Sequence, residues 1–185
     1  MRKNFGKKTW LYPLPVLIIG SYDKEGKADA MNAAWGGIYD YDKVMLCLSG
    51  DHQTTQNIKE KGAFTISFAD AAHVKAADYV GLVSAKKAAD KMEKAGFHTI
   101  KSEFVDAPLI EELPMALECR LIKVSDDGNI IGEIINVNAD EKILGEGGLI
   151  DTAKLDAISY DPVNNVYVRM GEKVGNAFSD GAELG

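Results

Sequence analysis

Cysteine and histidine are scarce in this chain, which has 2 cysteines and 3 histidines among 185 residues. The sequence has no Cys-x-x-Cys pair and no Cys/His set with metal-ligand spacing, which argues against a structural zinc site or a disulfide framework. Cys47 and Cys119 each lie within a short apolar run. We expect both to be buried free thiols in the reducing environment of the cytoplasm.

Long apolar runs are missing too. Four basic residues precede the segment LYPLPVLIIG and could mimic a secretory signal, but Pro13 and Pro15 interrupt that segment and Asp23 follows it closely. No apolar stretch approaches the roughly 18 residues that a transmembrane helix needs. We therefore expect a soluble, cytoplasmic protein with no membrane partner.

A basic excess is also absent. The chain has 28 acidic against 21 basic residues and a net charge of −7, which argues against nucleic acid as a partner. Any site for an anion must therefore be built locally. The length suits a single domain spanning residues 1–185, with an extended N-terminal arm at 1–15 and a C-terminal tail at 172–185. The arm is expected to pack either on a partner subunit or across its own domain.

Most of the remaining pattern predicts antiparallel strands. A hairpin is expected from Val16–Tyr22 through a turn at 23–26 to a strand that begins at Ala28 and runs into Gly36-Gly37. Alternation of apolar and polar residues predicts a second hairpin, with strands at 116–124 and 130–138, and a short strand pair follows near AISYD and VYVRMG. Six or more such strands with few helices predict a mainly β fold, a small closed barrel with short flanking helices.

The stretch 44–68 combines structure with a candidate anion site. The apolar run VMLCL predicts a buried strand, a helix should follow with Asp51 as its cap and Gly62 as its C-terminal stop, and AFTISF predicts a second strand. The turn SGDHQTT places hydroxyl groups and a histidine where a helix start leaves backbone N–H groups unpaired, which suits a phosphate. The alternative is that these residues simply cap the helix.

Two further segments support the candidate site. The run Asn32-Ala33-Ala34-Trp35-Gly36-Gly37 leaves a strand backbone bare, so a flat ligand could approach its peptide groups. The alternative is a bulge or a tight strand crossing, which is the usual meaning of glycines within a strand. The segment 69–96 predicts two short helices, interrupted at 81–84 and stopped at Gly96, with Ser84 and Lys91 at the start of the second. The basic residues of this segment, Lys86, Lys87 and Lys91, could reach a nearby anion or form an ordinary solvated face.

Taken together, the chain resembles the flavin reductase-like family of FMN-binding split barrels, in particular its flavoredoxin-like branch. The resemblance covers nearly the whole chain and rests on the order and spacing of five segments, which read PLPVLIIGSYDKEGKADAMNAAWGG, SGDHQTTQNIKEKGAFTISF, DYVGLVSAKKAADKM, LPMALECRLIKV with IIGEIINV, and YVRMGEKVGNAFSDG. It implies a six-stranded antiparallel split β-barrel with flanking helices, a homodimer, and one FMN per subunit at the dimer interface.

The resemblance also implies roles for individual residues. Matching positions are expected along the isoalloxazine ring, at the phosphate-binding turn and at a helix start that adds polar contacts to the phosphate. In that order these are Asn32, Ala33, Ala34 and Trp35; Ser49, Gly50, Asp51, His52, Thr54 and Thr55; and Ser84 and Lys91. The aromatic residue near the ring is left open among Trp10, Trp35, Tyr79 and Tyr167. The chain departs from the family pattern at Gly50, where proline is common, in the missing proline pair before Val44, and in the absence of arginine from 49–57.

No Ser/His/Asp, Cys/His or paired-carboxylate arrangement suggests a general base or a nucleophile, and a flavin enzyme needs neither. Three functions follow from the resemblance. The first is an oxidoreductase in which NAD(P)H reduces the bound flavin, which then passes electrons to free flavin, a ferric complex or another acceptor. The second is an electron carrier that keeps its FMN and docks redox proteins. The third is a ligand-binding or sensory domain without turnover.

Overall fold

A curved, seven-stranded antiparallel sheet forms the body of the protein. The computed structural model describes residues 1–185, except for the side chain of residue 183. The strands lie in the order β3-β2-β6-β9-β10-β5-β4. Their bounds are β2 Leu17–Tyr22, β3 Ala28–Ala33, β4 Gly36–Asp40, β5 Lys43–Leu46, β6 Ala63–Phe68, β9 Met115–Val124 and β10 Ile130–Ala139. The fold is therefore mainly β, a split barrel with a few short helices, as the sequence predicts. Two details differ from the prediction: the sheet has seven strands instead of six, and the barrel is not closed, because its edge strands β3 and β4 do not pair with each other.

The inner face of this sheet is the main core. Alternate residues of the central strands point inward, because side chains of a strand point to opposite faces in turn. They include Ile19 of β2, Phe64 of β6, Cys119 of β9 and Ile130 of β10, each 0% exposed. Ile58 of α1 (Gln53–Lys61) packs into the same cluster. Helix α1 is thus anchored to the barrel core through Ile58, which positions the turn that precedes it.

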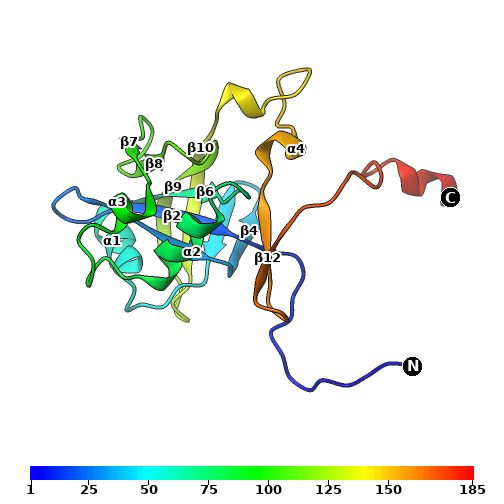
Figure 1. The fold of residues 1–185 in the computed structure, drawn as a ribbon, viewed down its shortest axis with the longest axis horizontal. Helices are drawn as coiled ribbons and strands as arrows, with labels where there is room; N and C mark the ends of the chain where they lie inside the picture. The colour runs from blue at the N-terminus through cyan, green and yellow to red at the C-terminus, as the bar shows by residue number, and fades with distance from the viewer.

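A second core lies on the outer face of β2 and β3. Val16, Ile18 and Ala30 pack there against Ala77 and Val80 of α2 (Val74–Leu82). The short helix α3 (Lys91–Ala95) borders the same cluster and ends at Gly96, whose φ of 70° needs a residue without a side chain. Figure 1 shows α1, α2 and α3 grouped at one end of the body. This grouping places the turns before α1 and α3 close to β3.

A separate three-stranded sheet stands beside the barrel, in the order β1-β11-β12. It consists of β1 Leu14–Pro15, β11 Ile158–Asp161 and β12 Val166–Arg169. Residues 1–13 and 170–182 are exposed, and both termini extend away from the body (Figure 1). The N-terminal arm therefore does not lie across its own barrel. Remaining elements are β7 Thr99–Lys101, β8 Pro108–Ile110, η1 Glu141–Ile143, α4 Thr152–Leu155 and η2 Asp180–Leu184.

Several sequence predictions need correction. The strand from Ala28 does not run into Gly36-Gly37: β3 ends at Ala33, and Gly36–Asp40 forms β4, which pairs with β5 at the opposite edge of the sheet. Helix α1 has His52 rather than Asp51 at its N-cap, although Gly62 ends it as predicted, with a φ of 69°. Ser84 belongs to the loop before α3, which begins at Lys91. The two cysteines also differ, because Cys119 is buried and Cys47 is exposed.

The other predicted elements are confirmed. The β9–β10 hairpin turns at 125–129, where the N–H of Ser125 donates to the carbonyl of Asn129 at 2.8 Å. The β2–β3 and β11–β12 pairs are also present. Among the described helices, the longest have nine residues, and none is long and apolar enough to span a bilayer.

Candidate functional site

Two adjoining cavities lie beside β3 and α2. The first also contacts the turns that precede α1 and α3, and the second contacts the β11–β12 pair. The first has a volume of about 280 Å³ and the second of about 380 Å³. They share Asn32 of β3 and Gly81 and Leu82 at the end of α2. Gly81 matters for this approach, since an added Cβ would lie 3.0 Å from the Cβ of Asn32. A glycine at the last turn of α2 therefore lets helix and strand meet along the wall that both cavities share.

The first cavity is polar on one side. Residues from three separate segments reach it, from β3, from the start of α1 and from the loop before α3. His52, Thr54, Ser84 and Lys91 all line it. The start of α1 faces it, and no side chain in the described part of the chain caps that helix. The first backbone N–H groups of a helix have no acceptor within the helix, so these donors and the positive end of the helix dipole favour an anion here.

Two buried charges form the floor of this cavity. The ammonium Nζ of Lys91 lies 3.0 Å from Oδ1 of Asp29, and the two side chains are 4% and 5% exposed. Thr54 donates its hydroxyl hydrogen to the other carboxylate oxygen of Asp29 at 3.1 Å. The cluster is therefore a buried, hydrogen-bonded ion pair. Removal of one partner strongly destabilises the folded protein, because the other charge is then left buried without compensation.

The second cavity is lined by aromatic and amide groups. Tyr167 of β12 donates to Oδ1 of Asp78 on α2 at 2.8 Å. The amide nitrogen of Asn32 donates to the carbonyl of Ala77 at 3.0 Å and to the hydroxyl of Tyr167 at 3.4 Å. Partial burial and the carboxylate of Asp78 raise the pKa of Tyr167 to about 12, so its hydroxyl is neutral at physiological pH. Because the amide hydrogens of Asn32 are engaged in this way, its carbonyl oxygen Oδ1 is the group available as an acceptor.

The structure brings together half of the twelve predicted site residues. Asn32, His52, Thr54, Ser84 and Lys91 line the first cavity, and Ala34 lines the second. They come from positions between 32 and 91 and meet only because β3, α1 and the loop before α3 converge. This convergence agrees with the predicted pairing of a bare strand edge with an anion-binding turn.

The other six lie elsewhere. The side chain of Ala33 points into the barrel core, and the exposed Trp35 accepts a hydrogen bond from the N–H of Cys47 through its carbonyl. Thr55 is buried and donates to the carbonyl of Ser49 at 2.8 Å. In the part of the chain that the structure describes, neither cavity is lined by Ala33, Trp35, Ser49, Gly50, Asp51 or Thr55. Ser49 and Thr55 therefore shape the turn.

Sequence reasoning missed the residues that complete the site. Asp29, Gln53, Gly81, Asp78 and Tyr160 also line the two cavities. The glycine within a helical pattern was a readable signal, because an interior helix glycine often marks close packing. Asp78 and Asp29 carried no local signal, since their partners Tyr167 and Lys91 lie 89 and 62 residues away. Tyr167, one of four aromatic candidates, is the one that lines a cavity here.

Comparison with known proteins places this geometry in a family. The family model described as "Flavin reductase like domain" matches residues 9–158. The chain belongs to this family. All residues of the first cavity lie within the matched range, whereas Tyr160, Asn165 and Tyr167 of the second cavity lie beyond it.

Solved structures in this family agree over the whole chain. Flavoredoxin of Desulfovibrio vulgaris (Miyazaki F) is 38% identical, with a TM-score of 0.94 over 98% of this chain and 100% of that one. Flavoredoxin from Methanosarcina acetivorans is 28% identical, with a TM-score of 0.88 over 100% of this chain and 99% of that one.

Sequence relatives match parts of the chain. An uncharacterised protein of Archaeoglobus fulgidus is 31% identical over 69% of this chain and 73% of its own length. Another, from Aeropyrum pernix, is 29% identical, and the match spans 64% of this chain but only 46% of the relative.

The residues present suit a flavin phosphate. The first cavity offers hydroxyl, imidazole, ammonium and helix N–H donors, which are the groups that hold phosphate in proteins. The second offers tyrosine side chains and the small Ala34, which leave room for a flat ring. The two cavities adjoin at Asn32, Gly81 and Leu82, so the groups of both lie within reach of one ligand that has an aromatic and an anionic end.

Proposed function

We propose that the protein is an FMN-binding redox protein. The observation that carries the proposal is the junction of a polar, donor-rich cavity and an aromatic cavity on the two sides of Asn32. The flavoredoxin neighbours and the family match support the assignment. The phosphate would lie near the start of α1, and the ring would lie along Ala34 beside Tyr167.

Bound FMN would supply the electron-transfer chemistry, and the protein would position and tune it. Oδ1 of Asn32 can accept a hydrogen bond from a ring N–H. The unpaired edge of β3 offers further backbone groups near Ala34, because β3 is the last strand on its side of the sheet. Backbone N–H donors placed there would stabilise negative charge on a reduced ring. A reduction potential of bound FMN equal to that of free FMN would contradict this role.

We favour an NAD(P)H-dependent flavin or ferric reductase, and an electron carrier of the flavoredoxin kind is the second candidate. The flavoredoxin neighbours give the carrier specific support. Anaerobic mixing with NADH or NADPH separates the two. Bleaching of the flavin absorbance within seconds supports a reductase. Colour that persists until a redox protein is added supports a carrier, and a colourless preparation that binds no added FMN contradicts both.

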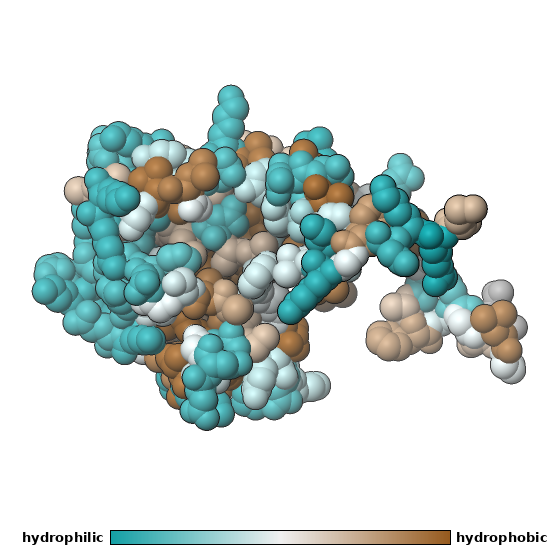
Figure 2. Space-filling view, turned by 90° about the horizontal axis from the view of Figure 1, so that it is seen from below, coloured by the Kyte–Doolittle hydropathy of each residue, from teal (hydrophilic) through white to brown (hydrophobic). Residues whose placement is uncertain are grey.

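We further propose that the protein acts as a homodimer. Apolar side chains are exposed on the N-terminal arm, on β4 and on β12, where a monomer would leave them in water. They include Trp10, Leu11, Tyr12, Ile38, Tyr39, Val166 and Val168. Figure 2 shows apolar residues on the face seen from below and on the extensions that leave the body. Such patches are typical of interaction surfaces. Light scattering should give a dimer, and a monomer that retains flavin would contradict the proposal.

A further inference from the structure

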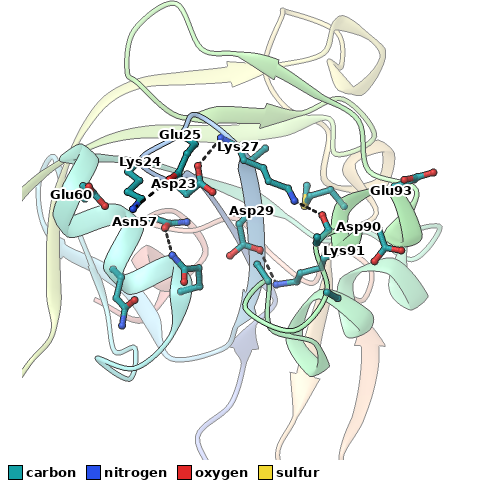
Figure 3. A pocket seen from close by; sticks show the side chains of 17 residues that line it. Asp23, Lys24, Glu25, Lys27, Asp29, Asn57, Glu60, Asp90, Lys91 and Glu93 are labelled. Carbon is teal, nitrogen blue, oxygen red and sulfur yellow. Dashed lines mark hydrogen bonds and ion pairs between the residues drawn. The ribbon is translucent and has the colours of Figure 1, made fainter.

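The first cavity, called the phosphate cavity from here on, is separated from a much larger cavity by the Asp29–Lys91 ion pair. The larger cavity has a volume of about 730 Å³ and lies between the β2–β3 turn, α1 and the segment 85–93 (Figure 3). Asp29 and Lys91 line both cavities, and Figure 3 shows their charged ends facing each other. An anion in the phosphate cavity therefore meets a pair of opposite charges and not an isolated cation.

The carboxylate of Asp29 occupies donors that an anion would otherwise use. Lys91 donates to Oδ1 at 3.0 Å and Thr54 donates to Oδ2 at 3.1 Å. The single hydroxyl hydrogen of Thr54 is thereby engaged. Asp29 is 4% exposed, so water screens its charge poorly. A phosphate beside Lys91 would experience repulsion from Asp29 as well as attraction to the ammonium group.

The larger cavity does not supply a compensating positive charge. Its lining carries six carboxylates and three lysines, including the Asp29–Lys91 pair. The carboxylates are Asp23, Glu25, Asp29, Glu60, Asp90 and Glu93, and the lysines are Lys24, Lys27 and Lys91. On the other side, Lys86 donates to the carbonyl of Asp51 at 2.9 Å, so one of its hydrogens is engaged. A hydrogen bond to a neutral carbonyl leaves the positive charge of Lys86 in place, so Lys86 attracts an anion equally with and without the carboxylate of Asp29. The charge that Asp29 can cancel is that of Lys91.

The geometry points to Asp29 as a specificity-determining residue of the flavin site, an inference that rests on the proposed function. Its carboxylate cancels the charge of Lys91 and lowers the affinity for the phosphate, while the ring cavity keeps its own contacts. The protein therefore favours FMN over riboflavin only modestly. A site of this kind exchanges its flavin readily, which suits a reductase that releases reduced flavin better than a carrier that must retain it.

The test compares FMN with riboflavin, which has the same ring but no phosphate. Fluorescence titrations of the full chain would give both affinities for the wild type and for Asp29→Asn. Glu93→Gln is the matched control, because Glu93 is an exposed carboxylate that lines only the larger of the two cavities. We expect Asp29→Asn to raise the FMN-to-riboflavin affinity ratio about tenfold or more, with riboflavin binding and the control unchanged. An unchanged or lower ratio would overturn the inference, since Asp29 would then only position Lys91.

A second variant guards against loss of folding, because Asp29→Asn leaves the buried Lys91 without its counter-charge. The double variant Asp29→Asn with Lys91→Gln replaces the ion pair by a neutral amide pair. If the two charges cancel, its affinity ratio stays close to the wild-type value. A tenfold fall would show that Lys91 acts as an uncancelled cation and would overturn the inference.

Failure of the proposed function gives a different result, in which neither flavin binds any variant. Inorganic phosphate then still tests Asp29. Added phosphate, compared with chloride at equal ionic strength, should raise the melting temperature of Asp29→Asn more than that of the wild type. Equal shifts would overturn the role of Asp29.

Discussion

Tyr167 donates its hydroxyl hydrogen to Oδ1 of Asp78 at 2.8 Å and thereby links β12 to α2. The same hydroxyl accepts a hydrogen from the amide of Asn32 at 3.4 Å. The three residues come from the small sheet, a helix and the barrel edge. Their hydrogen bonds orient the Asn32 amide, so the small sheet helps to form the second cavity.

This link makes the free energy of unfolding change with pH in the alkaline range. Burial and Asp78 raise the pKa of Tyr167 from about 10 to about 12 in the folded protein. The folded state therefore holds this proton more tightly, and the resulting stability is present below pH 10 and is lost between about pH 10 and about pH 12. Urea unfolding at several pH values should show a smaller alkaline loss for Tyr167→Phe than for the wild type. The fully exposed Tyr41→Phe variant should behave like the wild type, and identical pH profiles for all three proteins would contradict the assignment.

Asn32→Ala should weaken flavin binding by removing the acceptor that Tyr167 and Ala77 orient. The expected loss is that of one hydrogen bond, about 0.5–1.5 kcal/mol, and it should be equal for FMN and riboflavin because Asn32 acts on the ring. Fluorescence titration with both flavins measures it. Asn138→Ala is the control, because Asn138 is exposed in another cavity. A loss confined to FMN would instead place Asn32 at the phosphate.

The two thiols should react at very different rates. Cys47 is exposed, whereas Cys119 is 0% exposed and burial raises its pKa to about 12. An aromatic disulfide reagent should therefore label one thiol in the folded protein and the second only after unfolding. Cys47→Ser should abolish the fast phase. Fast labelling of both thiols in the native protein would contradict the buried position of Cys119.

Gly132 is required by the core, because a Cβ there would lie 2.5 Å from Cζ of Phe64. Gly132→Ala should lower the free energy of unfolding by about 1–3 kcal/mol, since β10 or the phenyl ring must move. Gly37→Ala is the matched control, because Gly37 also lies in a strand and an added Cβ meets nothing within 4 Å. Chemical denaturation measures both variants, and equal stabilities would contradict the close packing at Gly132.

Elements that depend on local interactions were predicted correctly from the sequence, and elements that depend on contacts between distant parts of the chain were not. The β9–β10 hairpin and the stop of α1 at Gly62 depend on alternation and on one backbone angle, and both were predictable. The short strands β7 and β8 have three residues each, too few for a period to show. The chain leaves β3 at Ala33 because its next residues join the opposite edge of the sheet, a tertiary choice that local pattern does not encode.

The same distinction applies to the candidate site. The turn before α1 and the bare backbone at Ala34 could be predicted from the sequence, because hydroxyl-rich turns and small residues at a strand are local signals. The pairing of Lys91 with Asp29 was not, because an Ala- and Lys-rich segment predicts a solvated face. Only the fold shows that Lys91 is 3% exposed while its neighbour Lys94 lies on the surface. The sequence thus predicted that Lys91 reaches an anion or lies on a solvated face, whereas the structure pairs it with the buried carboxylate of Asp29.

The barrel sheet ends at β3 on one side and at β4 on the other, and these two strands do not pair with each other. Amide groups on the outer edge of β3 consequently have no ladder partner, and they exchange their hydrogens with solvent more readily than those of the central strands. A ligand lying along Ala34 would slow that exchange at β3 and leave β4 unaffected. Deuterium uptake, followed segment by segment, would thus show whether the proposed flavin binds along this edge of the sheet, without a crystal of the complex.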